Sequence, residues 1–201
     1  MTAMNDVKKD LPTADQLNAA AERIRYRKSY AKMLYNTISS LIVVAAVAVL
    51  ISMLFLPVFR VTGSSMTPTM KNDDLLICNK RADFKSGDIV AFYFNNKVLL
   101  KRVIGTAGDV VDISEDGTVY VNGKALDEPY ISEKAFGECD IDLPYQVPDN
   151  RIFVMGDHRS VSVDSRSSSV GCIADEYIIG KVIFRLWPWE VIGPVHGGSA
   201  E

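Results

Sequence analysis

The chain is poor in the residues that most metal sites and many nucleophilic sites need: its 201 residues include two histidines and three cysteines. The cysteines are Cys78, Cys139 and Cys172, and they form neither a C-x-x-C motif nor a zinc-ligand spacing. We therefore expect no metal and no cofactor. In an oxidising compartment two of these cysteines could form a disulfide, with Cys139 and Cys172 as the candidate pair, and the sequence leaves this question open.

The scarcity of histidine also weighs against the commonest catalytic triads. His158 follows Asp157, as it could in a Ser–His–Asp site, but a lone histidine of this kind is more often structural. His196 lies in the small-residue tail GPVHGGSAE and is expected to be solvated. A sortase-like thiol nucleophile would need a positioned histidine and arginine. The sequence therefore favours none of these sites.

Charge is absent from one long stretch: no Asp, Glu, Lys or Arg occurs in residues 33–59. About 20 apolar residues cross a bilayer as a helix, whereas a helix in a soluble core usually keeps a polar face. The stretch is also longer than the apolar part of a cleaved signal peptide, and no small-x-small site follows it. We predict an uncleaved transmembrane anchor at residues 37–57.

Basic residues are concentrated before the anchor. Residues 1–36 contain seven Lys/Arg and four Asp/Glu, a net charge of +3, whereas the remainder contains 15 and 21, a net charge of −6. Positive flanks stay in the cytoplasm, so we expect a cytoplasmic tail at 1–36 and an extracytoplasmic domain at 58–201. Residues 13–35 favour a helix, and residues 1–12 are expected to be disordered. The acidic balance argues against nucleic-acid binding.

After Pro57 the pattern becomes that of β-strands. Short stretches rich in Val, Ile, Phe and Tyr alternate with turn residues, and Asp116-Gly117 is a strong hairpin signal. This spacing predicts a mainly β, antiparallel domain. The predicted strands lie within residues 74–80, 88–94, 97–105, 109–114, 118–123, 151–157 and 181–188.

A candidate nucleophile, Ser65, lies in GSSMTPTM shortly after the anchor. Gly63 can adopt backbone angles that other residues avoid, so the turn can present a serine hydroxyl, with main-chain N–H groups nearby for an oxyanion. Taken alone, the string is more typical of an ordinary Ser/Thr/Pro loop.

A candidate base, Lys101, lies in the predicted strand KVLLKRVIG. Strand alternation places Leu99, Lys101 and Val103 on one face, where burial would lower the lysine pKa. A fall from about 10.4 to about 8 corresponds to roughly 3 kcal/mol. The neutral amine could then accept a serine proton. The alternative, equally supported by this stretch, is that the stem packs while the ammonium reaches water.

A third polar stretch, VMGDHRSVSVDSRSSSVG, follows the strand predicted near residue 151. In it, Ser162 could orient the lysine amine, and Asp164 could pair with Arg166. A solvated polar loop is the ordinary alternative for such a composition.

Together these stretches resemble the bacterial type I signal peptidases, the membrane-bound serine–lysine enzymes that remove signal peptides from exported proteins. The resemblance runs from residue 38 to residue 188. GSSMTPT resembles the nucleophile motif, DLLICNK the strand that follows it, KRVIGTAGD the lysine motif, MGDHRSVSVDSR the third motif and GKVIFRLWP the closing strand.

The resemblance implies a fold of coiled antiparallel sheets and a role for each matching residue. Ser65 is the nucleophile, Lys101 the general base and Ser162 the hydroxyl that orients the lysine, while Gly63 and the Ser65 amide mark the oxyanion site. The supporting pairs are Asp157 with Arg102 and Asp164 with Arg166. The residues implied for substrate binding are Phe59, Arg60, Val61, Thr62, Val98, Leu99 and Leu100.

The implied function is cleavage of preprotein signal peptides after Ala-x-Ala-like sites at the outer face of the cytoplasmic membrane. The implied partners are those peptides, membrane lipids and, as a further candidate, the secretion translocase. Other classes remain: a catalytically silent chaperone relative, a self-cleaving repressor with a similar core, and a single-pass binding protein. Client range and oligomeric state are left open.

Three departures from the family pattern have expected consequences. Glycine at position 63 leaves only backbone donors for the oxyanion. The string Asn72-Asp73-Asp74 stands where a Gly-Asp pair is common, so that turn is expected to differ. His158 replaces the commoner asparagine, with no loss of activity expected. The short region 110–153 indicates the compact, Gram-positive-like form.

Overall fold

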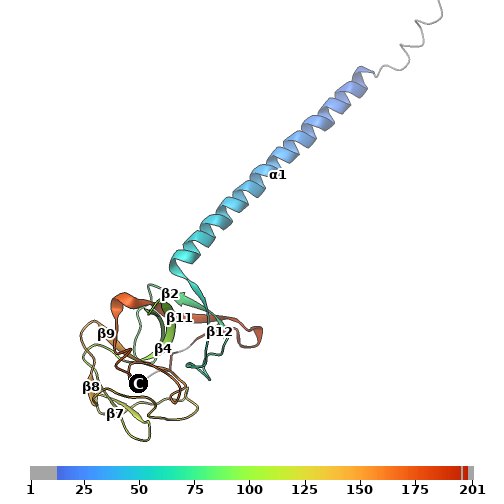
Figure 1. Cartoon of the computed structure of the whole chain (residues 1–201). Helices are drawn as coiled ribbons and strands as arrows, with labels where there is room; N and C mark the ends of the chain where they lie inside the picture. Colours follow the sequence, from blue (N-terminus) through green and yellow to red (C-terminus); the bar gives the residue numbers. More distant parts are fainter. Residues whose placement is uncertain (1–12, 196, 199–201) are drawn as a thin grey trace, which may run out of the picture. The chain divides into compact units, whose positions relative to one another are not determined.

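The computed structural model describes residues 13–195 and 197–198. The expectations for residues 1–12 and for His196 fall outside that range. The chain divides into two compact units, Met1–Ile51 and Ser52–Glu201, and each has its own architecture (Figure 1).

The N-terminal unit is dominated by one continuous helix, α1 (Ala14–Phe55), of 42 residues. It unites the expected tail helix with the expected anchor. Apolar side chains such as Leu41, Val44 and Leu50 are more than half exposed, as suits a helix that faces lipid. At about 1.5 Å per residue the helix is about twice as long as a bilayer core is thick. It is therefore long and apolar enough to cross a membrane, and it ends two residues before Pro57, which cannot donate a backbone hydrogen bond.

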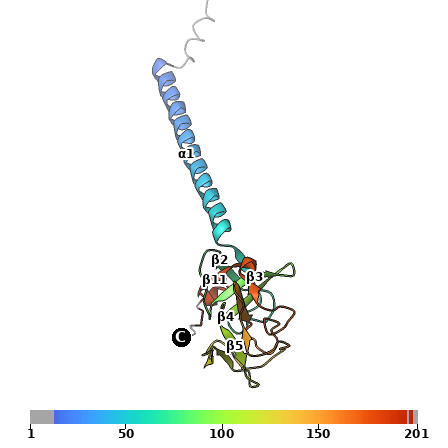
Figure 2. The same cartoon turned by 90° about the vertical axis from the view of Figure 1, so that its left-hand side faces the viewer.

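The C-terminal unit contains a large antiparallel sheet (Figure 2). Its strand order is β1-β2-β11-β3-β4-β9-β10, and β12 also pairs with β11. The strands are β1 (Val58–Arg60), β2 (Leu75–Asn79), β3 (Ile89–Phe94), β4 (Lys97–Gly105), β9 (Arg151–Met155), β10 (Ile173–Ala174), β11 (Ile178–Trp187) and β12 (Gly193–Pro194).

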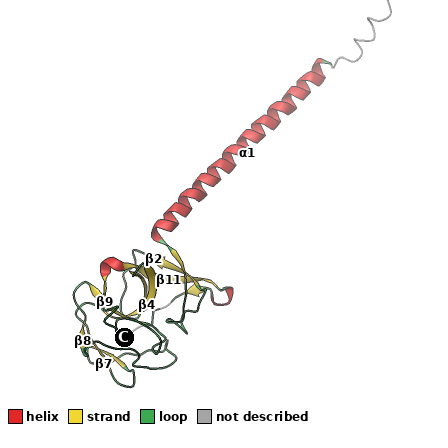
Figure 3. Cartoon of the chain, in the orientation of Figure 1, coloured by secondary structure: helices red, strands yellow, loops and turns green. Residues whose placement is uncertain are grey.

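A second sheet has the order β7-β6-β5-β8. Its strands are β5 (Val110–Ile113), β6 (Val119–Val121), β7 (Lys124–Ala125) and β8 (Tyr145–Gln146). The predicted hairpin is confirmed: β5 and β6 pair antiparallel around Asp116-Gly117, and Gly117 has a φ of +83°. Beyond the end of α1, the described part of this unit contains as helix only the 3-10 turns η1 (Asp175–Tyr177) and η2 (Trp189–Val191) (Figure 3).

The predicted fold class is confirmed. Six of the seven predicted stretches contain a whole strand, and the seventh, 181–188, overlaps β11, which begins earlier, at Ile178. Every pairing in the described residues is antiparallel. The strands that the sequence did not predict are short edge or connecting pieces: β1, β7, β8, β10 and β12. All three cysteines are free, and the structure contains no Cys139–Cys172 disulfide.

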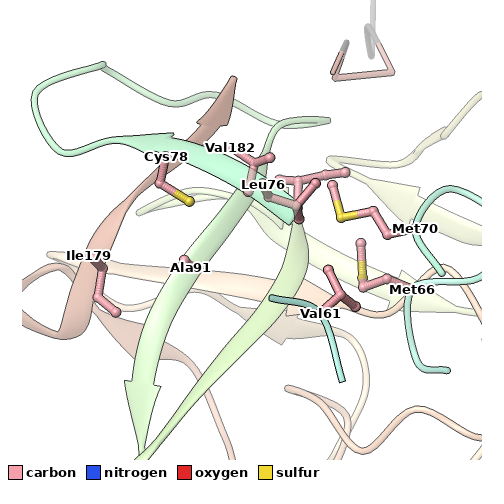
Figure 4. Packing of buried hydrophobic residues seen from close by; sticks show 9 residues of the cluster. Val61, Met66, Met70, Leu76, Cys78, Ala91, Ile179 and Val182 are labelled. Atoms are coloured by element: carbon pink, nitrogen blue, oxygen red, sulfur yellow. The ribbon is translucent and has the colours of Figure 1, made fainter. Parts of the chain in front are cut away.

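One hydrophobic cluster includes side chains from the segment that follows β1 (Figure 4). Val61, Met66 and Met70 come from that segment and pack together against Leu76 of β2. Each of these four side chains is buried. Because Met66 immediately follows Ser65, burial of the methionine fixes the backbone of the candidate nucleophile.

Candidate active site

The turn that carries Ser65 connects β1 to β2. Gly63 has a φ of +99°, which favours glycine. The turn closes when the Ser64 carbonyl accepts hydrogen bonds from the Thr67 N–H at 3.1 Å and from Thr67 Oγ1 at 2.8 Å. Met66 and Met70 then anchor its far side in the core. The sequence therefore builds a rigid turn with a half-buried serine at its bend.

The oxyanion donors expected from the sequence differ in their availability. The Gly63 N–H donates to Asn72 Oδ1 at 3.0 Å, so this donor is already occupied. The cause is the departure noted above, since Asn72 begins the Asn-Asp-Asp string. Within the described residues the Ser65 N–H has no hydrogen-bond partner, so it is the backbone donor that remains for a developing negative charge.

Ser65 opens onto a cleft of about 490 Å³. One wall is the segment from β1 to the nucleophile turn, and the other is the first half of β4. The cleft brings together all seven residues expected to contact substrate. Its lining residues are Phe59, Arg60, Val61, Thr62, Gly63, Ser65, Met66, Lys97, Val98, Leu99 and Leu100. Two facing extended segments suit a peptide that adds as a strand.

Lys101 lies in the middle of β4, opposite Val90 of β3, and its side chain is 3% exposed. Burial is the main cause that lowers the pKa of Lys101 to about 8; the charges of Asp164 and Asp157 oppose this shift, and that of Arg166 adds to it. Its Nζ donates to Ser162 Oγ at 3.0 Å. The alternative in which the ammonium reaches water is therefore wrong.

The loop after β9 links the lysine to the nucleophile turn. The Ser65 carbonyl accepts a hydrogen bond from the His158 N–H at 3.1 Å. A Cβ at Gly156 would lie 2.5 Å from that carbonyl oxygen and would clash with Ser162 Oγ. Gly156 is thus the point where the Ser65 backbone and the lysine's hydroxyl partner meet. Within the described residues no hydrogen bond joins Ser65 Oγ to Lys101 Nζ; such contacts are often looser without substrate.

Two buried ion pairs hold this loop. Arg102 donates to both oxygens of Asp157, at 2.8 and 2.7 Å. Arg166 donates to both oxygens of Asp164, at 2.8 and 2.9 Å, and Asp164 also accepts from the Gly156 N–H at 2.9 Å. The structure thus brings together both pairs expected from the sequence.

The Asp157 carboxylate has no hydrogen bond to His158 in the described part of the chain, because its oxygens are taken by Arg102 and Thr69. A Ser–His–Asp triad built on these two residues is therefore contradicted. The residues described also contain no group of three or more His, Cys, Asp or Glu side chains that could hold a metal ion.

Sequence reasoning missed several residues of the supporting network. Gly156 lies inside the third motif, directly before Asp157 and His158, so a structural role for this glycine could have been suspected. Glu128 and Tyr130 gave no signal, because they lie in an irregular segment far away along the chain. Glu128 pairs with the buried Arg159, and the Tyr130 ring stacks 3.6 Å from the Arg102 guanidinium.

The fold and the cleft define a class: a β-domain protein with a cleft beside a serine and a buried lysine, in a chain whose N-terminal helix is long and apolar enough to cross a membrane. The comparisons with known proteins agree. A family model described as "Signal peptidase, peptidase S26" matches residues 34–187. Signal peptidase IB of Staphylococcus aureus is 34% identical over 179 residues, covering 79% of this chain and 92% of the relative. Signal peptidase I of Bacillus licheniformis is 34% identical over 172 residues, covering 79% and 91%.

A solved signal peptidase I from Enterococcus faecalis V583 is 28% identical, with a TM-score of 0.44, and the match covers 50% of this chain and 97% of that one. The family assignment rests on the family model and the curated relatives. The chain belongs to the peptidase S26 family of signal peptidases. It has the function of a type I signal peptidase, a serine endopeptidase that acts on the signal peptides of preproteins.

Proposed function

We propose that Ser65 and Lys101 form the catalytic dyad. The observation that carries the proposal is the buried amine: its pKa is lowered to about 8, and its hydrogen bond is to the neutral Ser162 hydroxyl. An amine in this state is a competent general base near neutral pH. The Ser65 backbone lies against Gly156 together with that same hydroxyl.

In the reaction, the Ser65 hydroxyl attacks the carbonyl carbon of the scissile bond while Lys101 Nζ accepts its proton. The tetrahedral oxyanion is stabilised by the Ser65 N–H. The Gly63 N–H joins it only if it exchanges its Asn72 partner for the oxyanion. Lys101 then returns the proton to the leaving amine, and water, activated by the same amine, hydrolyses the acyl-enzyme. Ser162 keeps the amine oriented throughout.

The substrate binds as an extended strand in the cleft, between the 59–62 segment and the 98–100 segment of β4. We expect the part of this cleft beside Ser65 to select Ala-like side chains at the first and third positions before the cut. The supporting pairs, Arg102 with Asp157 and Arg166 with Asp164, fix the walls without touching the peptide.

The anchor places this chemistry at the membrane. Residues 37–57 span the bilayer, residues 1–36 are cytoplasmic, and residues 58–201 are extracytoplasmic, in line with the distribution of basic residues. Six residues separate Phe59 from Ser65, at most about 20 Å when extended. The nucleophile is thereby held near the level at which a signal peptide leaves the bilayer. Membrane lipids and the secretion translocase are the further partners that this placement implies.

The test is cleavage of a preprotein with an Ala-x-Ala site by the full chain in lipid vesicles. Ser65→Ala should lower kcat by at least about 1,000-fold. Ser64→Ala is the matched control, since its exposed side chain lies one position away, and it should retain activity. If the Ser65→Ala variant cleaved the preprotein as fast as the parent, the proposed Ser65/Lys101 dyad would be wrong.

A further inference from the structure

His158 contacts both halves of the site. Its N–H donates to the Ser65 carbonyl at 3.1 Å, and its carbonyl accepts from the Ser162 N–H at 3.1 Å. These main-chain bonds need no particular side chain. The ring makes a separate contact: its Nδ1 lies 3.1 Å from Thr67 Oγ1, on the far side of the nucleophile turn.

The position of one proton determines the direction of that ring contact. The Thr67 hydroxyl has a single proton, and its 2.8 Å contact with the Ser64 carbonyl requires that proton, because a carbonyl only accepts. The hydroxyl oxygen must therefore accept from His158. The ring is then protonated on Nδ1, and an Nδ1 that carries a hydrogen cannot serve as a base.

The ring thus completes a chain of hydrogen bonds from the loop after β9 to the bend of the nucleophile turn: His158 Nδ1–H to Thr67 Oγ1, and Thr67 Oγ1–H to the Ser64 carbonyl. The main-chain bond to Ser65 holds the other side of the same turn. The loop after β9 thus holds the nucleophile turn at two points, which fixes the orientation of the turn; a single contact would leave the turn free to rotate.

We propose that the His158 ring, as its Nδ1–H tautomer, is a positioning residue that holds the Ser64–Thr67 turn in register with Lys101. This inference rests on the proposed Ser65/Lys101 dyad for its kinetic consequences, but not for the tautomer. An asparagine at this position can make the same contact, because its Nδ2 can occupy the place of Nδ1 and donate the same hydrogen bond.

The kinetic test uses the full chain in vesicles with four variants: His158→Ala, Thr67→Val, the double variant and His158→Asn. Each of the first two should lower kcat about 5- to 20-fold, the worth of one positioning hydrogen bond, with KM within about twofold. The double variant should be no slower than the slower single one, because both break one chain of bonds. His158→Asn should restore kcat to within about threefold of the parent.

The pH limb assigned to Lys101 should stay in place in all four variants, since the ring acts on geometry and not on the amine. Thermal midpoints measured on the same samples separate a positioning defect from unfolding. The proposal is overturned if His158→Ala keeps the parent kcat, if His158→Asn is as slow as His158→Ala, or if the two single losses multiply.

A second measurement does not depend on activity. In the full chain labelled with 15N-histidine, the His158 signal is assigned by its loss in His158→Asn. At a pH where the ring is neutral, Nδ1 should carry the proton and Nε2 should not. The opposite tautomer would overturn the inference even in an active enzyme. Conversely, if Ser65→Ala cleaves as well as the parent, the proposed dyad is wrong, but the tautomer of His158 can still be measured by the 15N spectrum.

Discussion

Lys101 and Arg102 are neighbours on β4, and each side chain is at most 3% exposed. The environments of these two buried cations differ sharply. Arg102 donates to both oxygens of Asp157 and to the Gly87 carbonyl at 2.7 Å. Lys101 donates to a neutral hydroxyl, and within the described residues it has no salt bridge. Strand β4 thus carries a charge-paired arginine, Arg102, next to a lysine, Lys101, without a carboxylate partner in the described part of the chain.

The difference shows how the fold reserves a lysine for chemistry. Asp164 is the carboxylate with the strongest electrostatic effect on Lys101. Both of its oxygens, however, accept hydrogen bonds from Arg166, and one also accepts from the Gly156 N–H. The arginines therefore keep the acidic groups of the loop occupied. A buried amine without a counter-ion favours its neutral form, whereas a buried guanidinium with a bidentate partner stays charged and structural.

The comparison predicts the largest effect for a change that restores charge at the lysine position. Lys101→Arg should lower kcat at least about 1,000-fold, because an arginine stays protonated and cannot accept the Ser65 proton. Lys101→Ala should be equally inactive. Rates are measured on the vesicle-bound preprotein. An arginine variant with a tenth of the parent activity would contradict the role given to the neutral amine.

Breaking the buried Arg102–Asp157 ion pair should destabilise the fold. Arg102→Met leaves the Asp157 carboxylate buried without its cationic partner, which should cost about 3–5 kcal/mol of unfolding free energy. The measurement is the thermal midpoint of the full chain in detergent. The matched control is Arg60→Met, which removes the exposed Arg60–Asp73 pair (side chains 65% and 54% exposed) and should cost less than about 1 kcal/mol. Equal losses would mean that burial of the pair is unimportant.

The Lys101 amine, which has no carboxylate partner among the described residues, determines how activity depends on pH. Only the neutral amine accepts a proton, so kcat/KM should rise about tenfold per pH unit below the Lys101 pKa of about 8 and level off above it. Activity at pH 6 should be about 100-fold below the plateau. The assay needs a peptide without titratable groups in this range. A rate that still climbs at pH 10 would place Lys101 in contact with water.

The smallest effect is a gain in stability. Lys101→Met removes a desolvated amine and should raise the unfolding free energy by about 1–3 kcal/mol at pH 7. Because the native pKa is lowered, the unfolded chain binds more protons between about pH 8 and 10.4, so the parent gains stability as pH rises through that window. The advantage of the methionine variant should shrink accordingly. A constant advantage from pH 7 to pH 10.5 would indicate better packing instead of a charge effect.

The sequence predicts the regular parts of this molecule well. Strand β4 coincides with the predicted stretch 97–105, and the Asp116-Gly117 turn joins β5 to β6. Both predictions follow from local patterns, namely residue alternation and turn chemistry. The burial of Lys101, which its own stretch left undecided, follows from packing against strands and a loop that are distant in the chain.

The remaining parts of the site depend on contacts that no local pattern encodes. Asn72 occupies the Gly63 amide across a turn, and Glu128 reaches Arg159 from an irregular segment. Short strands such as β7 and β8, with two residues each, exist only because a neighbouring strand offers them partners. The His158–Thr67 contact spans 91 positions and likewise appears only once the fold is known.

The most direct test of this account is a titration of the Lys101 amine itself. The full chain carrying Ser65→Ala is labelled with 13C at lysine Cε, and the Lys101 signal is assigned by its loss in a Lys101→Arg sample. The comparison of Lys101 with Arg102 predicts that the Lys101 amine titrates near pH 8, well below the ordinary lysine pKa of about 10.4. A Lys101 signal that titrates near that ordinary value would contradict the claim that the fold keeps a neutral base beside the nucleophile.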